Sequence, residues 1–302
     1  MPVRNGERYL EQAWNGILQN FEFGDEVIII NDGSTDQTSN LLKRINENFD
    51  DLRIIETKSY GIVSALNIGF KESRNSWVAR YDVDDTYPMH RISRQRPLIS
   101  EDVSVIFADY TMHLENGINM GVFPSPVTDF ASRVSFLRSQ QTAHSVALIN
   151  RNHFFLAGGY RYEDFPAEDL GLWIRISQFG KILSVPEVLM RYRLSNFSTS
   201  GSRQEDAFKV RQKLVKEMPN LLSPEAPLDY LIFETIETYK TARFGTLRTI
   251  LFLRNLELAE YLGLLPKTEK KTSKFKLAAQ NPLDVSQAIW HKTMRDLYRK
   301  LS

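Results

Sequence analysis

Three groups of acidic residues in the sequence have the types and spacing for chemistry. The first is Asp32, which is followed by Gly33 and comes one residue after the strand-like run 26–30. An aspartate at the end of a strand can accept hydrogen bonds from N–H or hydroxyl groups of a ligand, and a glycine lets the backbone turn close to it. A plain turn that caps the next helix is the alternative interpretation.

The second acidic group contains Asp82, Asp84 and Asp85 and follows the strand-like run 76–81. Carboxylates this close repel one another unless something neutralises them. Mg²⁺ and Mn²⁺ can do so, because they bind through one or two carboxylates together with substrate phosphates. The alternation of a strand would place Asp82 and Asp84 on one side. We therefore predict a divalent-cation site here, with a solvated acidic loop as the alternative.

The third acidic group is Glu168 and Asp169, directly before the apolar helical stripe that includes Trp173. Carboxylates at a helix N-terminus are favoured by the macrodipole, so simple capping is one interpretation. The functional interpretation makes Asp169 a general base that removes the proton of a hydroxyl group. The residues alone leave both interpretations open.

The elements that must hold these groups alternate between strand and helix. The predicted strands cover 26–30, 52–56, 76–81 and 103–107, and the predicted helices cover 7–20, 37–49 and 62–73. This order is typical of an α/β domain with a mostly parallel sheet flanked by helices, which binds ligands at the carboxyl ends of its strands. Helical spacing prevails later in the chain. We therefore predict an α/β domain over 1–202 and a helical C-terminal region over 203–302.

The composition argues against several classes of function. The 302 residues contain 38 Lys and Arg against 37 Asp and Glu, so no net charge favours a nucleic-acid partner. Cysteine is absent, which excludes disulfides and thiol catalysis, and the five histidines contain no His-x-x-x-His pair. The sequence has neither a long apolar run nor the pattern of a signal peptide, so we expect a cytoplasmic protein.

Together the motifs resemble the inverting, nucleotide-sugar-dependent glycosyltransferases of family 2, which have the Rossmann-like GT-A fold. The resemblance runs from Met1 to about Ser200 and depends on the order and spacing of motifs that are weak one by one. These motifs are Pro-Val-x-Asn-Gly-Glu at 2–7, Asp-Gly-Ser-Thr-Asp at 32–36, Gly-Ile-x-x-Ala-Leu-Asn-x-Gly at 61–69, Ala-Arg-x-Asp-x-Asp-Asp at 79–85, the spaced residues Pro88, Arg91 and Gln95, His-Ser-Val at 144–146, Gly-Gly-Tyr at 158–160, Glu-Asp-Leu-Gly-Leu-Trp at 168–173 and Tyr-Arg at 192–193.

The resemblance implies a donor site for a nucleotide diphosphate sugar, with a UDP-sugar as the expected donor. Asp32 would hold the base. Asp82 and Asp84 would be the family's Asp-x-Asp pair, which contacts the ribose and the diphosphate-bound Mg²⁺ or Mn²⁺. The residues implied to contact the nucleotide are Pro2, Val3, Asn5, Asp32, Gly33 and Asp82.

The resemblance also implies an acceptor site. Asp169 would deprotonate an acceptor hydroxyl of a glycan or of a lipid-linked glycan, and a single displacement would then invert the anomeric carbon. The residues implied to lie on the acceptor or sugar side are Asp85, Glu168, Trp173, His144 and Arg193.

The chain departs from the family at its start. The family has a complete apolar strand before Pro-Val-x-Asn, whereas only Met1 precedes Pro2 here. We therefore expect a nearly missing first strand, which a start upstream of Met1 would explain. A histidine that often follows Tyr-Arg in the family is also absent after Arg193.

The C-terminal region suggests two further contacts. The basic loop 267–276 could touch anionic lipid headgroups at the inner face of a membrane, and the apolar stretch 246–265 could pack on a second protomer. Peripheral membrane contact and a homodimer through C-terminal helices are therefore expectations.

Two other functions are open on the sequence. Asp82-Val83-Asp84-Asp85-Thr86 fits the Asp-x-Asp-x-Thr pattern of haloacid-dehalogenase-like phosphatases, in which Asp82 would be the nucleophile and Asp84 an acid or base. A GT-A domain that binds ligands but has lost catalysis is the second alternative, because the first strand and the histidine are missing.

Overall fold

The structure is a computed structural model, which describes residues 1–138, 142–194 and 204–217. These residues lie in one compact unit, Met1–Leu221, and confirm the α/β fold. The helical region predicted after residue 202 is described only as α9 (Gln204–Glu217), so the segments 246–265 and 267–276 lie outside the described residues. Among the described helices, none has the length and apolar character that a membrane span requires.

The first sheet is parallel and contains three strands in the order β1-β2-β3. The central strand β2 (Val27–Asp32) is rich in isoleucine and almost wholly buried, as expected for a strand that is covered on both faces. It pairs over its whole length with β3 (Leu52–Thr57). In contrast, β1 is only Pro2–Val3, which pairs with Ile30 and Asn31.

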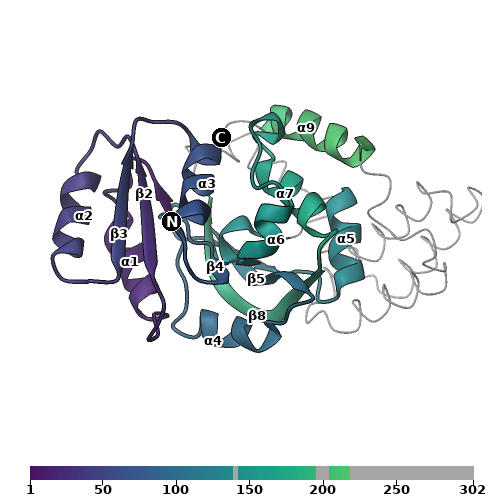
Figure 1. The fold of residues 1–302 in the computed structure, drawn as a ribbon, viewed down its shortest axis with the longest axis horizontal. Coiled ribbons are helices and arrows are strands. Elements are labelled where there is room, and N and C mark those ends of the chain that lie inside the picture. The colour runs from purple at the N-terminus through teal and green to yellow at the C-terminus, as the bar shows by residue number, and fades with distance from the viewer. Residues whose placement is uncertain (139–141, 195–203, 218–302) are drawn as a thin grey trace, which may run out of the picture. The chain divides into compact units, whose positions relative to one another are not determined.

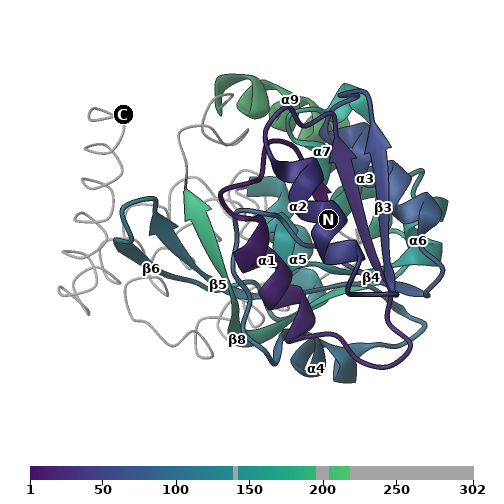
Figure 2. The ribbon, with the colours of Figure 1, turned by 90° about the vertical axis from the view of Figure 1, so that its left-hand side faces the viewer.

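The second sheet is mixed and contains five strands. Its long strand β5 (Val103–Leu114) pairs in parallel with β8 (Lys181–Leu194) and antiparallel with the short β7 (Leu148–Asn150). On the other side of β7 lies β4 (Trp77–Ala79), again antiparallel. The β5–β6 hairpin, with β6 at Asn119–Phe123, extends on the side of the unit opposite to β3 (Figure 2).

Helices cover both sheets (Figure 1). Around the first sheet lie α1 (Leu10–Leu18), α2 (Thr38–Asn46) and α3 (Ile62–Glu72). Around the second lie α4 (Arg91–Gln95), α5 (Asp129–Arg138), α6 (Arg151–Leu156) and α7 (Glu168–Ile176). The helix predicted over 7–20 is observed as α1, and its Leu10, Ala13, Trp14 and Ile17 are buried, whereas Leu18 is exposed.

Candidate active site

The segment that carries Asp82, Asp84 and Asp85 is a turn and not the end of a strand. β4 ends at Ala79, so the expectation that strand alternation places Asp82 and Asp84 on one side is wrong. Hydrogen bonds fix the turn instead. The Asp82 N–H donates to the Tyr87 hydroxyl over 2.9 Å, and the Arg80 guanidinium donates to Asp82 Oδ1 over 2.8 Å.

Asp85 is turned into the protein and is fully buried. Its Oδ2 accepts the Ser145 hydroxyl and its Oδ1 accepts the Arg193 N–H over 2.9 Å. Burial and the charge of Asp84 raise its pKa well above the ordinary value. Because protein donors reach both oxygens, Asp85 fastens the turn to β8, and the implied contact with metal or sugar stays a prediction.

Asp84, like Asp82, is half-buried. Burial, followed by the neighbouring charge of Asp82, raises its pKa to about 6, although Arg193 and Arg80 oppose this rise. Two carboxylates that repel each other in a poorly solvated place favour a cation nearby. The Arg193 guanidinium meets part of that demand, because its Nε donates to the Asp84 backbone carbonyl over 2.9 Å.

Glu168 and Asp169 begin α7, where backbone N–H groups favour negative charge. Glu168 is only 8% exposed, and its Oε2 has no hydrogen-bond partner among the described residues. Burial, followed by the charge of Asp169, raises the pKa of Glu168 to about 7. Asp169 is more exposed, and its Oδ1 accepts the Leu170 N–H over 2.7 Å.

The turn and the start of α7 belong to one electrostatic site. The charge of Asp82 raises the pKa of Glu168, and the charge of Arg80 lowers it. Arg80 acts in the same way on Asp84. We call Arg80, Asp82, Asp84, Glu168 and Asp169 the Arg80 cluster. The second and third acidic groups therefore influence each other electrostatically, although they lie more than 80 residues apart in the chain.

Two aromatic groups complete this cluster. The Tyr160 hydroxyl lies 2.7 Å from His144 Nε2, and Arg80, Asp169, Glu168 and Asp82 all act on the Tyr160 pKa, although burial is the largest cause of its rise. Burial and the charge of Arg80 lower the pKa of His144 well below its ordinary value, so the imidazole is neutral at pH 7.

Trp173 does not match its implied position on the acceptor side. It is completely buried, with its ring edge-on to Phe107 and His144. A residue without exposed surface supports the site through packing and does not touch an acceptor. Leucine and isoleucine neighbours on α7 are buried with it, which explains why the apolar stripe of this helix is so wide.

The carboxylate of Asp32 binds groups of the protein backbone. It is 4% exposed, and its carboxylate accepts the backbone N–H groups of Tyr60 and Gly61, each over 2.8 Å, as well as the Thr57 hydroxyl. These bonds hold the loop that leads from β3 to α3. In this structure Asp32 organises backbone and presents no oxygen that lacks a donor, so the implied contact with a base stays a prediction.

Gly33 lies beside this loop with φ +67°, and a Cβ there would be 2.8 Å from the Ser59 nitrogen. Only glycine fits such a close approach. The turn after β2 therefore requires glycine at position 33, which fits the interpretation of this segment as a turn.

The first five residues of the chain make contacts within the protein. Pro2 and Val3 form β1 and are buried, so they position the loop that follows. Asn5 is exposed, its N–H donates to the Ser34 hydroxyl over 2.9 Å, and its Oδ1 accepts the Thr35 N–H over 2.8 Å. The predicted nucleotide contacts of Pro2, Val3 and Asn5 are therefore untested.

Arg193 is anchored in several directions. Besides its bonds to Asp84 and Asp85, its guanidinium lies 4.9 Å from the centre of the Tyr9 ring and 3.3 Å from Gln12 Oε1. This anchoring orients a positive charge toward the turn. A role toward a diphosphate stays a proposal.

The described residues contain no group of three His, Asp or Glu side chains that would hold a metal ion by themselves. The donor set nevertheless fits Mg²⁺ or Mn²⁺ bound together with a substrate, because such ions use one or two carboxylates plus phosphate oxygens and water. Asp84, with its desolvated carboxylate beside Asp82, supplies this minimal set.

The sequence did not single out two members of the site, Arg80 and Tyr160. Both lie in the motifs quoted above. Arg80 could have been found from the sequence, because it is a basic residue at the end of an apolar strand, two positions before an aspartate. Arg80 is only 4% exposed in its side chain and forms an ion pair with Asp82. A buried arginine of this kind normally has a carboxylate partner.

Comparisons with known proteins identify relatives of this chain. A family model described as "Glycosyl transferase family 2" matches residues 1–155. A curated protein of Haemophilus influenzae, described as an uncharacterized glycosyltransferase, is 24% identical over 277 residues, which are 85% of this chain and 84% of the relative. One from Rickettsia conorii is 26% identical over 214 residues, which cover 68% of this chain but only 34% of that relative.

Two solved structures have a similar fold. Staphylococcus aureus TarS 1–349 in complex with UDP-GlcNAc gives a TM-score of 0.57 at 16% identity, covering 87% of this chain and 90% of that one. A mannosyltransferase from Pyrobaculum calidifontis in complex with GDP-Man and Mn²⁺ gives the same TM-score, 0.57, at 16% identity, covering 96% and 82%. At these identities the likeness concerns the fold alone.

Proposed function

Because this chain belongs to glycosyltransferase family 2, we propose that it transfers a sugar from a nucleotide diphosphate donor to a hydroxyl group with inversion at the anomeric carbon. The observation that carries the proposal is the acidic turn of Asp82 and Asp84, which Arg80 and Arg193 hold by hydrogen bonds, together with the acidic pair that begins α7.

The turn serves the donor in this proposal. Asp82 and Asp84 would hold a divalent cation, Mg²⁺ or Mn²⁺, which would supply positive charge to the leaving diphosphate. The anchored guanidinium of Arg193 adds positive charge on the same side. Solved structures of similar fold contain UDP-GlcNAc in one case and GDP-Man with Mn²⁺ in another. We propose a UDP-sugar as donor, with a GDP-sugar as the alternative that the test below includes.

Asp169 serves the acceptor. Its carboxylate takes the proton of the acceptor hydroxyl while that oxygen bonds to the anomeric carbon and the bond from this carbon to the diphosphate oxygen breaks. Glu168 beside it holds a proton near neutral pH, because burial raises its pKa. We propose that the acceptor is a glycan, free or lipid-linked, in surface-polysaccharide synthesis at the inner face of a membrane.

The two alternatives are not supported. A phosphatase of the haloacid-dehalogenase type explains the residues 82–86 but leaves Glu168 and Asp169 without a role, and the family match covers the chain from residue 1 to 155. A domain that only binds ligands would not need an acidic pair at the start of α7 beside the turn.

The test is a panel of UDP- and GDP-sugars incubated with the protein, with and without Mn²⁺, while the released nucleoside diphosphate is measured. We expect release of nucleoside diphosphate from at least one donor, and only when the cation is present. Asp84→Asn should abolish this release. Asp50→Asn is the matched control, because Asp50 is exposed and lies far along the chain from every acidic motif.

Three results would contradict parts of the proposal. Equal release of nucleoside diphosphate in EDTA and in Mn²⁺ would show that the reaction does not need a cation. Release from no donor, together with no thermal shift on adding any nucleotide with Mn²⁺, would remove the transferase activity. Hydrolysis of an aryl phosphate that depends on Asp82 would favour the phosphatase.

A further inference from the structure

The spaced motif of Pro88, Arg91 and Gln95 has no role in the proposed transfer reaction. Arg91 and Gln95 lie on α4, and both side chains are completely buried. The Gln95 amide donates through Nε2 to the carbonyl of Ile106 on β5 over 2.9 Å and to that of Val146 over 2.8 Å. These two bonds fix α4 to the second sheet, so Arg91 stands on a fixed support.

The guanidinium of Arg91 lies against two buried tyrosine rings. Its Cζ is 4.3 Å from the centre of the Tyr81 ring and 4.7 Å from the centre of the Tyr87 ring. A cation over an aromatic face is attracted by the charge distribution of the ring, and more strongly where water is excluded. The Nη2 group also donates to the Ala147 carbonyl over 3.3 Å. Arg91 therefore holds both rings in place.

Of these two tyrosines, Tyr87 is the one whose hydroxyl is bonded to the acidic turn. It accepts the Asp82 N–H over 2.9 Å. Burial raises the pKa values of both hydroxyls. At Tyr87 the charges of Asp85 and Asp82 add to the rise. At Tyr81 the charge of Asp25 does so. The position of the Tyr87 ring therefore decides where the backbone of Asp82 lies.

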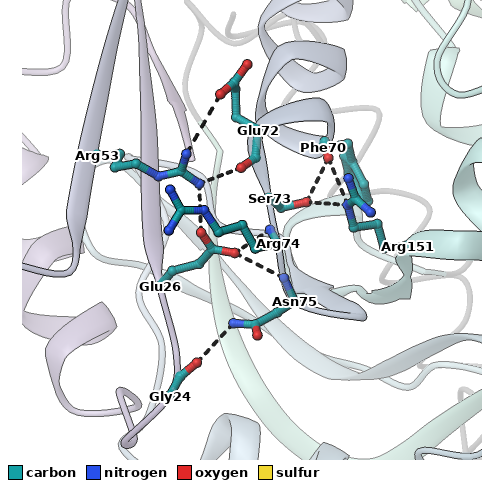
Figure 3. A network of polar contacts seen from close by, with 9 residues as sticks. All are labelled: Gly24, Glu26, Arg53, Phe70, Glu72, Ser73, Arg74, Asn75 and Arg151. Carbon is teal, nitrogen blue, oxygen red and sulfur yellow. Dashed lines mark hydrogen bonds and ion pairs between the residues drawn. The ribbon is translucent and has the colours of Figure 1, made fainter.

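The strand that leads into the turn has a fixed start (Figure 3). Glu26 Oε1 accepts the backbone N–H groups of Arg74 and Asn75, which precede β4. Arg53 forms an ion pair of 2.7 Å with the same carboxylate. However, β4 ends before the turn begins, so strand pairing does not fix Asp82. The bond to the tyrosine hydroxyl supplies what the strand does not.

This bond closes a short loop of the chain, from Asp82 to Tyr87. The far end of the loop is fixed to β8, because the Thr86 N–H donates to the Arg191 carbonyl over 3.2 Å and the Thr86 carbonyl accepts the Arg191 N–H over 2.8 Å. Asp84 lies between the two fixed ends. A loop that is already ordered loses less conformational freedom when a ligand binds, and Mg²⁺ in particular demands near-ideal geometry.

We propose that Tyr87 is a positioning residue for the divalent cation. Its hydroxyl closes the loop through the Asp82 N–H and so orders the carboxylates of Asp82 and Asp84 before the cation binds with the donor. Tyr87 does not touch the reacting atoms, and Arg91 supports it by holding its ring. The inference rests on the proposed function, because it concerns the cation site of that reaction.

The test compares Tyr87→Phe with Tyr81→Phe. Each variant loses one hydroxyl from a buried ring that lies against Arg91, and the two residues are similarly buried, at 5% and 7% exposure. The first readout is amide exchange without metal or nucleotide. Tyr87→Phe should speed exchange at Asp82 by about fivefold or more, the factor that corresponds to one ordinary hydrogen bond. The amide of Thr86, bonded to β8, is the internal reference.

The second readout is the release of nucleoside diphosphate at increasing Mn²⁺ concentration. In Tyr87→Phe the half-saturating Mn²⁺ concentration should rise by about fivefold, because the cation must now order the loop itself. The rate at saturating Mn²⁺ should stay within about twofold of the parent rate. A merely structural defect would lower that rate and leave the half-saturating concentration unchanged. Tyr81→Phe should keep the half-saturating concentration of the parent.

Two results would overturn the role of Tyr87 and leave the transferase proposal standing. One is an equal half-saturating Mn²⁺ concentration in the two variants of an active parent. The other is unchanged exchange at Asp82 in Tyr87→Phe. In contrast, a parent chain that releases no diphosphate from any donor and binds no nucleotide with Mn²⁺ would overturn the transferase proposal and this inference together.

Should Tyr87→Phe fail to fold, fluorotyrosine is placed at position 87, with the same replacement at position 81 as the control. Fluorotyrosine keeps the ring and the hydroxyl but makes the oxygen a poorer hydrogen-bond acceptor. A higher half-saturating Mn²⁺ concentration for the replacement at position 87 then supports the proposal, and equal concentrations overturn it.

Discussion

Arg80 and Asp82 form an ion pair of 2.8 Å whose guanidinium end is almost completely buried. The guanidinium also donates to the carbonyl of Tyr81, and its charge lowers the pKa values of Asp84, Glu168 and His144. The pair therefore joins the strand β4 to the acidic turn and sets the electrostatics of the candidate active site. A single buried cation among several carboxylates is a position where a substitution has large effects.

We predict that Arg80→Met lowers the free energy of unfolding by about 3 kcal/mol, because it leaves Asp82 partly buried without its partner. Urea denaturation measures this loss. The double variant Arg80→Met/Asp82→Asn is the control, since removing both charges should cost less than the sum of the two single changes. Strict additivity would show that the pair contributes nothing to stability. In folded Arg80→Met, the pKa of His144 should rise, as NMR titration of the imidazole can measure.

The α/β architecture could be predicted because its signals are local. The apolar run that ends at Asp32 and the stripe of α1 each require only neighbouring residues to be recognised. The mixed second sheet could not be predicted in the same way. β7 has only three residues, and β8 contains Pro186 and shifts register against β5, so neither shows a clean alternation.

The candidate site could be predicted in its residue types but not in its roles. The sequence identified Asp32 and Asp85 as acidic residues near strand ends, but their partners are far along the chain. Asp32 binds N–H groups 28 and 29 residues away, and Asp85 binds a hydroxyl 60 residues away. Whether a carboxylate faces a ligand or the protein depends on such distant donors, which no local pattern specifies.

We predict that Asp32→Asn lowers the free energy of unfolding by about 2 kcal/mol without any nucleotide present, because the charged acceptor of the Tyr60 and Gly61 N–H groups is lost. Urea denaturation measures the loss, and amide exchange at Tyr60 and Gly61 should become faster. Asp50→Asn is the control at an exposed position. Unchanged stability together with weakened nucleotide binding would instead assign Asp32 to the ligand.

The raised pKa of Glu168 gives a pH dependence of stability with a defined sign. Burial, the charge of Asp169 and the charge of Asp82 raise the pKa from its ordinary value of 4.5 to about 7, although Arg80 opposes this. Between these values the folded protein binds more protons than the unfolded one, so stability falls as pH rises through this window. The contribution of Glu168 is fully present below pH 4.5 and is lost above pH 7.

We therefore predict that Glu168→Gln, which resembles the protonated acid, has little effect on unfolding at pH 4.5 and stabilises the protein at pH 8 by about 2 kcal/mol. Urea denaturation of both proteins at several pH values tests this. Glu101→Gln, at an exposed position, should show no such trend. A stabilisation that does not change with pH would mean that Glu168 is charged in the folded protein throughout.

Asp169→Asn separates the two interpretations of the acidic pair at the start of α7. As a general base, Asp169 should be needed for proton removal, so transfer should fall by about 10²–10⁴-fold while donor binding persists. As a helix-capping residue it should change stability by about 1 kcal/mol or less and leave turnover intact. Measuring donor affinity by calorimetry, turnover by diphosphate release and stability by urea on one preparation distinguishes these outcomes. Asp206→Asn, exposed on α9, is the matched control and should match the parent protein in all three. Near-normal transfer by Asp169→Asn would move the base to another residue of the Arg80 cluster, and Glu168 would then be the next carboxylate to replace.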